Sequence, residues 1–393
     1  MFRYLFVISK LPIPKDLDGL TLIDSSLFEY APKDCIIDIV TVGTNTENEK
    51  TEFRKKMQSQ YPAVDRIFFI SHSLVRFARL ISIFSLSILG IKIKLSFPGR
   101  ASYRFDKYDA AYVSPLAMYS WLSLNMPIFA NAVDSVARAS HRSAEMRPTM
   151  LNRIKAWLLA RWERKVMSDF DVVNLVSEDD LKFIRQRDNQ SRITHISNAV
   201  DFKHFAESAN NKPRAYGSIL FTGNFDYGPN RIAAIRLAFE IYPRIRELEP
   251  QAILWLVGRN PPVIVQNVEG IICTGFVDDI NRYYQAAEVY VCALTEGAGV
   301  KNKILEAMAS GCSVVTSSVG AEGISGIQAD EHFCLANNND EFVKYTIELL
   351  HNQPKARSMA SSARLVIESR ADWRAVSGKY FDVLRMIAAQ RHS

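Results

Sequence analysis

The chain is poor in cysteine and lacks a long apolar run. Five cysteines occur in 393 residues, with no C-x-x-C spacing, which argues against both a disulfide framework and a thiolate metal cluster. Cys273, Cys292 and Cys312 stand in apolar contexts and are expected to be small buried thiols in a reducing compartment. No cluster of His or Asp has the spacing of metal ligands, so we expect no bound metal and no cofactor.

The start of the chain does not have the pattern of a secretory signal. Residues 1–9 read as a first strand, without a long apolar region or a small-residue cleavage site. We therefore expect a cytoplasmic protein.

Charge is nearly balanced along the chain. The formal net charge is +6, and the Lys and Arg residues are scattered, which argues against a nucleic-acid partner. A length of 393 residues with 48% hydrophobic residues suits two domains with full cores.

Short apolar runs alternate with segments long enough for crossover helices, which predicts α/β architecture with parallel sheets. A first series of predicted strands comprises residues 2–8, 36–42, 66–70, 109–113, 127–130, 171–176 and 193–196. A second series comprises residues 218–222, 252–257, 270–273, 289–293, 313–316 and 332–335. Predicted helices between the later strands include residues 232–246 and 281–287. Two doubly wound sheets follow from this pattern.

The most informative stretch is a glycine-rich turn that opens a helix. Residues 297–311 read Gly-Ala-Gly-Val-Lys-Asn-Lys-Ile-Leu-Glu-Ala-Met-Ala-Ser-Gly, and a β-branched strand follows. Free amides and the positive end of the helix dipole favour an anion at such a start, and Gly297 and Gly299 let a ligand approach the main chain. A diphosphate fits this description.

Polar side chains on this helix extend the anion site. At 100° per residue, Asn302 and Glu306 share a stripe with Lys303 beside them, while Ile304, Leu305 and Met308 are expected to pack inward. Lys303 is suited to neutralising phosphate charge, and Glu306 to accepting hydrogen bonds from ribose hydroxyls. The alternative is an amphipathic helix whose Lys303 and Glu306 only decorate a solvated face.

The same stretch resembles the donor-binding signature of the retaining glycosyltransferases of family 4, which share the two-domain GT-B fold. Other segments agree with this resemblance: residues 221–230 (Phe-Thr-Gly-Asn-Phe-Asp-Tyr-Gly-Pro-Asn), 254–258 (Leu-Trp-Leu-Val-Gly), 275–279 (Gly-Phe-Val-Asp-Asp) and the linker-like 196–201 (Ile-Ser-Asn-Ala-Val-Asp). The resemblance covers most of residues 165–325 and is weak in the N-terminal third.

The resemblance implies a fold and a domain organisation. Two Rossmann-like domains are expected to face each other across a cleft. Residues 1–200 would bind the acceptor and residues 214–370 the nucleotide-sugar donor, and a terminal helix over residues 371–393 would pack back on the first domain. Ligands of open α/β sheets bind at the carboxyl ends of the strands, so the cleft is the expected active site.

The resemblance also implies site residues. Lys303 and Glu306 are the catalytic candidates of the second domain. The donor-binding candidates are Gly19, Gly223, Asn224, Arg259, Phe276, Val277, Glu296, Gly297, Ala298, Gly299, Val300, Lys301 and Asn302. The nucleotide base is expected to meet the backbone of Phe276 and Val277.

Two departures from the family pattern stand in this sequence. Family members often carry glutamates eight positions apart, but Ala298 stands eight positions before Glu306, and the nearest acid is Glu296. Many members place Arg and Lys after the first strand of the second domain, where this chain has Asn224 and Pro229-Asn230. Lys301 or Lys303 is the expected substitute.

Two features of the first domain are candidates for contacts with the substrates. Gly19 precedes an apolar helix, where the family's glycine turn approaches the diphosphate; a plain turn is the alternative. Asp134 follows the strand at residues 127–130 and is the third catalytic candidate, because its carboxylate can accept a proton or hydrogen bond from the acceptor hydroxyl. Capping of the next helix explains Asp134 equally well. His141 and Arg142 suit an acidic acceptor or an exposed basic face.

Residues 74–104 form a further candidate, for contact with a membrane. The apolar run at residues 80–91 is too short to span a bilayer, and basic residues border it. A buried helix with charged ends is the alternative. Membrane docking would imply a lipid-linked acceptor and a place at the inner face of the membrane.

These observations predict a metal-independent hexosyltransferase of cell-surface polysaccharide biosynthesis. It would move a sugar from a UDP- or GDP-linked donor to a hydroxyl of a glycan or glycolipid, with retention at the anomeric carbon. Two alternatives remain. One is a nucleotide-sugar epimerase of GT-B fold, and the other is a degenerate, non-catalytic scaffold that binds sugar nucleotides.

Overall fold

The computed structural model describes residues 1–9, 19–42, 46–70, 107–116, 126–187, 192–206, 214–297 and 299–392. The chain divides into two compact units. The first comprises residues 1–196 and 376–393, and the second comprises residues 197–375. The predicted contact segment at residues 74–104 and Ala298 lie outside the described residues.

The first unit is built on a parallel sheet with the order β3-β2-β1-β4-β5-β6-β7. Its strands are β1 (Phe2–Ile8), β2 (Cys35–Val42), β3 (Val64–Ile70), β4 (Ala110–Ser114), β5 (Ile128–Val133), β6 (Val172–Leu175) and β7 (Ile193–His195). The order reverses between β1 and β4, as in a doubly wound sheet. The strands are nearly continuous apolar runs because both faces are covered.

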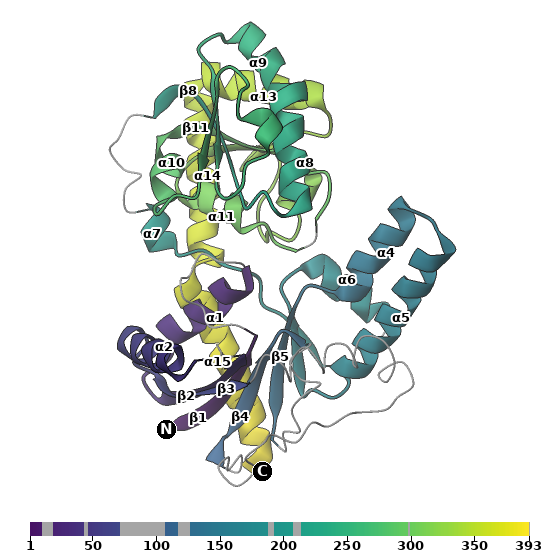
Figure 1. The fold of residues 1–393 in the computed structure, drawn as a ribbon, viewed down its shortest axis with the longest axis vertical. Helices are drawn as coiled ribbons and strands as arrows, with labels where there is room; N and C mark the ends of the chain where they lie inside the picture. The colour runs from purple at the N-terminus through teal and green to yellow at the C-terminus, as the bar shows by residue number, and fades with distance from the viewer. Residues whose placement is uncertain are drawn as a thin grey trace. The chain divides into compact units, whose positions relative to one another are not determined.

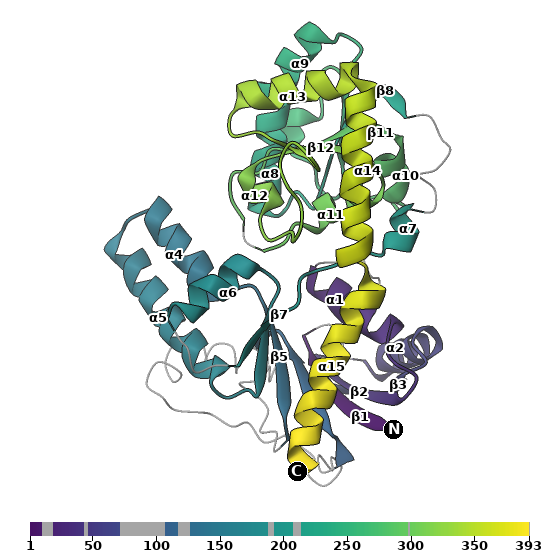
Figure 2. The same cartoon turned by 180° about the vertical axis from the view of Figure 1, so that it is seen from behind.

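Helices cover this sheet (Figures 1 and 2). They are α1 (Gly19–Glu29), α2 (Glu47–Gln60), α4 (Val136–Met146), α5 (Met150–Met167), α6 (Glu178–Arg185) and the later part of α15 (Trp373–His392). The rings of Tyr380 and Phe381 on α15 pack against Phe129 and Phe6 of the sheet, with centroids 5.7 and 6.4 Å apart. Residues 376–392 are therefore part of the first core.

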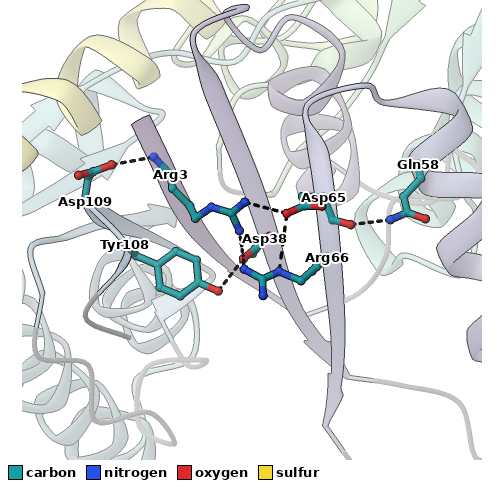
Figure 3. Close-up of polar contacts among 7 residues, drawn as sticks. All are labelled: Arg3, Asp38, Gln58, Asp65, Arg66, Tyr108 and Asp109. Atoms are coloured by element: carbon teal, nitrogen blue, oxygen red, sulfur yellow. Dashed lines mark hydrogen bonds and ion pairs between the residues drawn. The ribbon is translucent and has the colours of Figure 1, made fainter. Parts of the chain in front are cut away.

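A buried carboxylate connects three strands of the first unit with Tyr108, two residues before β4 (Figure 3). The side chain of Asp38 on β2 is fully buried. It accepts hydrogen bonds from Arg3 of β1 at 2.9 Å, from Arg66 of β3 at 2.8 Å and from the Tyr108 hydroxyl at 2.7 Å. Arg3 also contacts the partly exposed Asp65 at 2.8 Å. Two guanidinium groups and one hydroxyl group therefore donate to the same carboxylate.

The second unit is built on a parallel sheet with the order β10-β9-β8-β11-β12-β13. Its strands are β8 (Ala215–Thr222), β9 (Ile253–Val257), β10 (Ile271–Gly275), β11 (Ala287–Cys292), β12 (Ser313–Thr316) and β13 (Cys334–Leu335). Its helices are α7 (Phe202–Ala206), α8 (Gly228–Arg236), α9 (Tyr242–Leu248), α10 (Asn281–Ala286), α11 (Asn302–Ala309), α12 (Ser318–Ala321), α13 (Asn339–His351) and α14 (Gln353–Arg370), with a short 3-10 turn at Val263–Val265. The strand order reverses between β8 and β11.

These two sheets confirm the predicted α/β class, and every predicted strand is present with boundaries shifted by a few residues at most. The predicted single helix over residues 232–246 is wrong in detail. It is divided into α8, a π-helical turn at Leu237–Ile241, and α9. Pro243 has no backbone N–H and cannot continue the regular hydrogen bonding of an α-helix. The wider π turn before it accommodates the proline.

The chain passes between the units beside a buried tryptophan. Trp373 is fully buried, and its amide donates to the carbonyl of Val200 at 3.3 Å. An isolated parallel bridge joins Val200 to Asp372. The second unit thus closes on itself where its two ends meet.

Candidate functional site

Three turns gather at the carboxyl ends of β8, β9 and β10. The amide of Gly223 donates to Val257 at 3.0 Å, and that of Phe225 donates to Arg259 at 2.9 Å. Gly258 has φ 134°, and a Cβ there would lie 2.0 Å from the carbonyl oxygen of Gly223. Only glycine allows this approach, which brings the turn after β8 beside Arg259.

Strand β11 is the neighbour of β8 in the sheet, so the glycine turn after β11 and the start of α11 follow a strand next to β8. Gly297 and Gly299 have φ of 130° and 73°, in the region that favours glycine. Lys301 is the N-cap residue of α11, and its side chain caps no helix amide. Its ammonium group instead donates to the carbonyl of Gly299. Lys301 therefore lies on the glycine turn, outside the helix proper.

The inward face of α11 is as predicted. Ile304, Leu305 and Met308 are all at most 1% exposed, which fixes the rotation of the helix. Asn302, at its first position, accepts a hydrogen bond from the Nδ2 of Asn198 at 3.1 Å. Asn198 belongs to the segment that resembles the family's linker. This contact joins the start of the second unit to the start of α11.

Lys303 joins the first turns of α11 and α8, the helices that follow the two strands where the strand order reverses. Its Nζ donates to Oδ1 of Asn230 at 2.7 Å and lies 4.6 Å from the ring centroid of Phe221. The Nδ2 of Asn230 in turn donates to the carbonyl of Asn224 at 2.9 Å. Burial of the ammonium group lowers the pKa of Lys303 to about 8. A positive charge is thus held at the switch point of the sheet, where ligands of such sheets bind.

A chain of hydroxyl groups orients Glu306. The Tyr284 hydroxyl donates to Oε2 of Glu306 at 2.8 Å and lies 2.7 Å from the hydroxyl of Thr222. Thr222 is 3.0 Å from the Tyr290 hydroxyl. The Tyr284 hydroxyl uses its only proton in the hydrogen bond to Glu306. The Thr222 hydroxyl is therefore the donor in its bond to Tyr284 and the acceptor in its bond with Tyr290. Burial raises the pKa of the Glu306 carboxyl, opposed by the Tyr284 hydrogen bond and the charge of Lys303.

The remaining donor candidates in the second unit follow the carboxyl ends of strands β8, β9, β10 and β11. The Arg259 guanidinium lies 4.6 Å from the ring centroid of Phe276, which is 51% exposed and available for stacking. Val277 and Glu296 are half-buried, and Val300 is buried. Asn224 forms a local turn by accepting from the amide of Asp226 at 3.0 Å.

Two of the candidates belong to the first unit. Gly19 is the first residue of α1. Asp134 follows β5, where the register shifts and Val133 adopts φ 65°, a strained value for a β-branched residue. The structure gives the capping role to Ser135, whose side chain accepts from the amide of Arg138 at 3.1 Å. Ser135 is thus the N-cap residue of α4, and the role of Asp134 stays a prediction.

Sequence reasoning missed the groups that hold Lys303 and Glu306 in place. Asn230 lies 73 residues before Lys303, and Thr222 lies 62 residues before Tyr284. Both belong to the segment 221–230 that the sequence marked, but nothing in that segment indicated these contacts. Tyr284 lies within the segment after residues 275–279, but its spacing alone gave no sign that it faces α11. In the described part of the chain, no group of three or more His, Cys, Asp or Glu side chains forms a candidate metal site. No described helix has the length and apolar character needed to cross a bilayer.

Comparison with known proteins finds a family match within the second unit. Residues 217–352 match the family described as glycosyl transferases group 1. The chain is 24% identical over 234 residues to an uncharacterised 44.6 kDa protein in the cps region of Klebsiella pneumoniae, covering 56% of this chain and 57% of that protein. It is 29% identical over 140 residues to the phosphatidyl-myo-inositol mannosyltransferase of Mycobacterium tuberculosis, covering 33% of this chain and 36% of that enzyme. The matches thus span less than two thirds of these relatives.

The fold is shared along the whole chain with a solved structure. The Anabaena protein HepE, in complex with UDP-glucose, superposes with a TM-score of 0.65 at 13% identity, covering 98% of this chain and all of that one. At this identity the likeness shows the fold alone. The chain, with two parallel sheets of seven and six strands, thus shares the GT-B fold of this solved structure, and its residues 217–352 match the glycosyl transferases group 1 family.

Proposed function

We propose that the protein is a retaining hexosyltransferase that moves a sugar from a nucleoside-diphosphate sugar to a hydroxyl group of a glycan or lipid-linked acceptor. One observation carries the proposal. In the second unit, the glycine turn, Lys303 and Glu306 converge where the strand order reverses between β8 and β11. Parallel α/β sheets bind ligands at this position.

In this proposal the diphosphate lies against the start of α11. Gly297 and Gly299 expose the main chain, the helix dipole favours an anion, and Lys303 supplies a full positive charge. When the bond between the anomeric carbon and the β-phosphate oxygen breaks, the electron pair goes to the leaving nucleotide. The amides and Lys303 stabilise that charge, so no metal ion is required for this step.

Glu306 would bind the ribose. Its Oε2 is held by Tyr284, which leaves the other carboxylate oxygen to accept from sugar hydroxyls. Phe276 and Val277 would meet the base, with the Arg259 and Phe276 stack supporting that wall. Asn224, Glu296, Val300, Lys301 and Asn302 would complete the donor site.

The acceptor would bind to the first unit, with Gly19 near the diphosphate and Asp134 as the group that contacts the acceptor hydroxyl or the transferred sugar. For retention, the acceptor oxygen bonds to the anomeric carbon on the face that the nucleotide leaves, and its proton goes to the leaving phosphate oxygen. A relative from a cps region and a phosphatidyl-myo-inositol mannosyltransferase support a role in polysaccharide or glycolipid synthesis. The inner face of the membrane is the place we propose for it.

The experiment combines donor screening with analysis of the product. UDP- and GDP-linked sugars are first screened by thermal shift, because a ligand of the folded state raises the melting temperature. The best donor is then incubated with glycan and lipid-linked acceptors, and the product is examined by NMR. We expect a glycoside with the anomeric configuration of the donor, formed equally well in the presence of EDTA.

Other outcomes would contradict specific parts of the proposal. An inverted product would reject retention, and loss of activity in EDTA that added metal restores would reject metal independence. An epimerised nucleotide sugar formed without acceptor would favour an epimerase. Donor binding without turnover on any acceptor would favour a non-catalytic scaffold.

Replacement of Glu306 by glutamine tests the ribose contact. We expect the affinity for the best nucleoside diphosphate to fall about tenfold, because a hydrogen bond to a charged acceptor becomes a weaker neutral one. The affinity for the 2′,3′-dideoxy analogue should change little, since it has no hydroxyl to donate. Titration calorimetry measures both, with Glu368→Gln on the exposed surface of α14 as the matched control. Equal losses for both nucleotides would place Glu306 elsewhere in the mechanism.

A further inference from the structure

One helical hairpin of the first unit has a large excess of basic residues. Helices α4 and α5 lie side by side and run antiparallel in the first unit (Figures 1 and 2). Residues 136–167 contain eight Arg and Lys residues against two glutamates, which equals the +6 net charge of the entire chain. One of those glutamates, Glu163, is fully buried. Arg138 is also largely buried and pairs with Asp180 of α6 at 2.9 Å, so the outer surface of the hairpin keeps its basic excess.

The buried glutamate explains why the hairpin keeps its shape. Glu163 on α5 accepts from the Ser135 hydroxyl at 2.8 Å and from the amides of Val136 and Ala137 at 2.7 and 3.2 Å. It thereby caps the first turn of α4 from the neighbouring helix. Its hydrogen-bonding capacity is used within the hairpin, so Glu163 does not neutralise the basic residues on the outer surface of α5.

The outer face of α5 also carries large apolar side chains. Met150, Leu151, Ile154 and Trp157 are 80%, 74%, 46% and 63% exposed. Met150, Ile154 and Trp157 stand at positions i, i+4 and i+7, so they form a stripe along one side of the helix. The buried residues Ala156, Glu163 and Met167 lie on the opposite side. We call the four exposed apolar residues the α5 stripe.

Basic residues border the α5 stripe on both sides and continue it. Arg161 follows on the same line, and other exposed basic residues flank it: Arg147, Arg153, Lys155 and Arg164. Among the described residues, no carboxylate pairs with any of these five. Unpaired cations around an exposed apolar stripe that contains a tryptophan are the features of a helix that lies in a membrane interface.

We propose that the α5 stripe and its basic border bind the surface of an anionic phospholipid bilayer. The apolar side chains enter the boundary between headgroups and acyl chains, and the arginines and lysines contact lipid phosphates. A second copy of the chain fits this face less well. In a symmetric dimer the same patch meets itself, which would bring two such strongly positive hairpins together. The proposal does not depend on the donor site and is tested without turnover.

The test is co-sedimentation of the full chain with vesicles of phosphatidylcholine, with and without phosphatidylglycerol. We expect binding to the anionic vesicles, decreasing with added salt, and little binding to phosphatidylcholine alone. Ile154→Ser with Trp157→Ser should weaken binding about tenfold, because it removes two apolar anchors. Arg153→Gln with Lys155→Gln should also weaken it about tenfold, because each cation near an anionic surface contributes.

Matched controls stand on the second unit. Val263→Ser with Ile264→Ser removes two apolar residues that are 76% and 60% exposed, and Lys344→Gln with Arg357→Gln removes two exposed cations. Both controls should bind vesicles as the unaltered chain does. All variants should keep their circular dichroism spectrum and their affinity for nucleoside diphosphate, because the altered side chains are exposed and outside the donor site.

Three results would overturn the proposal. The first is absence of binding to anionic vesicles, and the second is binding that the α5 variants and the controls reduce equally. The third is a dimer of the unaltered chain in analytical ultracentrifugation that dissociates in the Ile154→Ser and Trp157→Ser variant, which would make the stripe an interface between copies. If the unaltered chain bound anionic vesicles but no nucleoside diphosphate, the proposed donor site would be wrong and the proposal for the α5 stripe would stand.

Discussion

Replacement of Lys303 by methionine is expected to lower kcat about a hundredfold, in the range seen when one donor to a developing oxyanion is removed. Methionine keeps the length and apolar contacts of the side chain, including the contact with Phe221, but removes the charge. The lost group is the ammonium that Asn230 holds at 2.7 Å, beside the proposed position of the leaving diphosphate. Steady-state kinetics with the identified donor measure the effect.

The pH dependence gives a second readout of the same group. Burial lowers the pKa of Lys303 to about 8, so in the free protein the charge is present below that pH and is lost above it. The value of kcat/KM, which reports ionisations of the free enzyme, should therefore fall as the pH rises through about 8. This fall should be absent from the residual activity of Lys303→Met.

A control and a contrary result complete this prediction. Lys344→Met changes an exposed lysine of α13 in the same unit and should leave kcat unchanged. If Lys303→Met kept full activity, the diphosphate would have to be neutralised by another group. Lys301 on the glycine turn would then be the first candidate, because its ammonium group already lies at Gly299.

The sequence predicted the elements of the second unit well because their signals are local. The strand at residues 313–316 has the predicted bounds, and Ile304, Leu305 and Met308 face inward as their helical spacing requires. Lys303 and Glu306 were placed at the start of a helix by the same reasoning. Burial of one face fixes the rotation of a helix, so the direction of its polar residues follows from the sequence.

The partners of these residues could not be predicted, because the sheet brings them together from distant segments. Asn230 meets Lys303 only because β8 and β11 are neighbours in a parallel sheet. Tyr284 reaches Glu306 from α10, whose position depends on the same crossover. The alternation of strands predicted the sheets but not which side chains would face each other across their ends.

The basic surface of the α4 and α5 hairpin also could not be predicted from the sequence. Its basic residues were read as part of a scattered excess, since no short window of sequence is unusual. The exposure of Trp157 and the burial of Glu163, which only the structure shows, indicate that basic residues surround an exposed apolar stripe on α5. The sequence predicted a membrane contact at residues 74–104 instead, and that segment lies outside the described residues.

Replacement of Asp38 by alanine is expected to have the largest effect on stability, lowering the free energy of unfolding of the first unit by about 3 kcal/mol. The fully buried carboxylate accepts from Arg3, Arg66 and Tyr108, and alanine supplies no acceptor (Figure 3). Burial, followed by the hydrogen bond to Asp38, raises the pKa of Tyr108, so this hydroxyl stays protonated and would be left as a buried donor without its acceptor.

The matched control is the other acid in the same network. Asp65 contacts Arg3 at 2.8 Å, but its side chain is 46% exposed, so water replaces the lost contact in Asp65→Ala and the cost should be about 0.5 kcal/mol. Hydrogen exchange of the β1 and β2 amides measures the opening free energy of this unit separately from the other unit. Equal protection in the two variants would show that Arg3 and Arg66 are stabilised by solvent alone. In that case the buried carboxylate would contribute no more than a surface ion pair does.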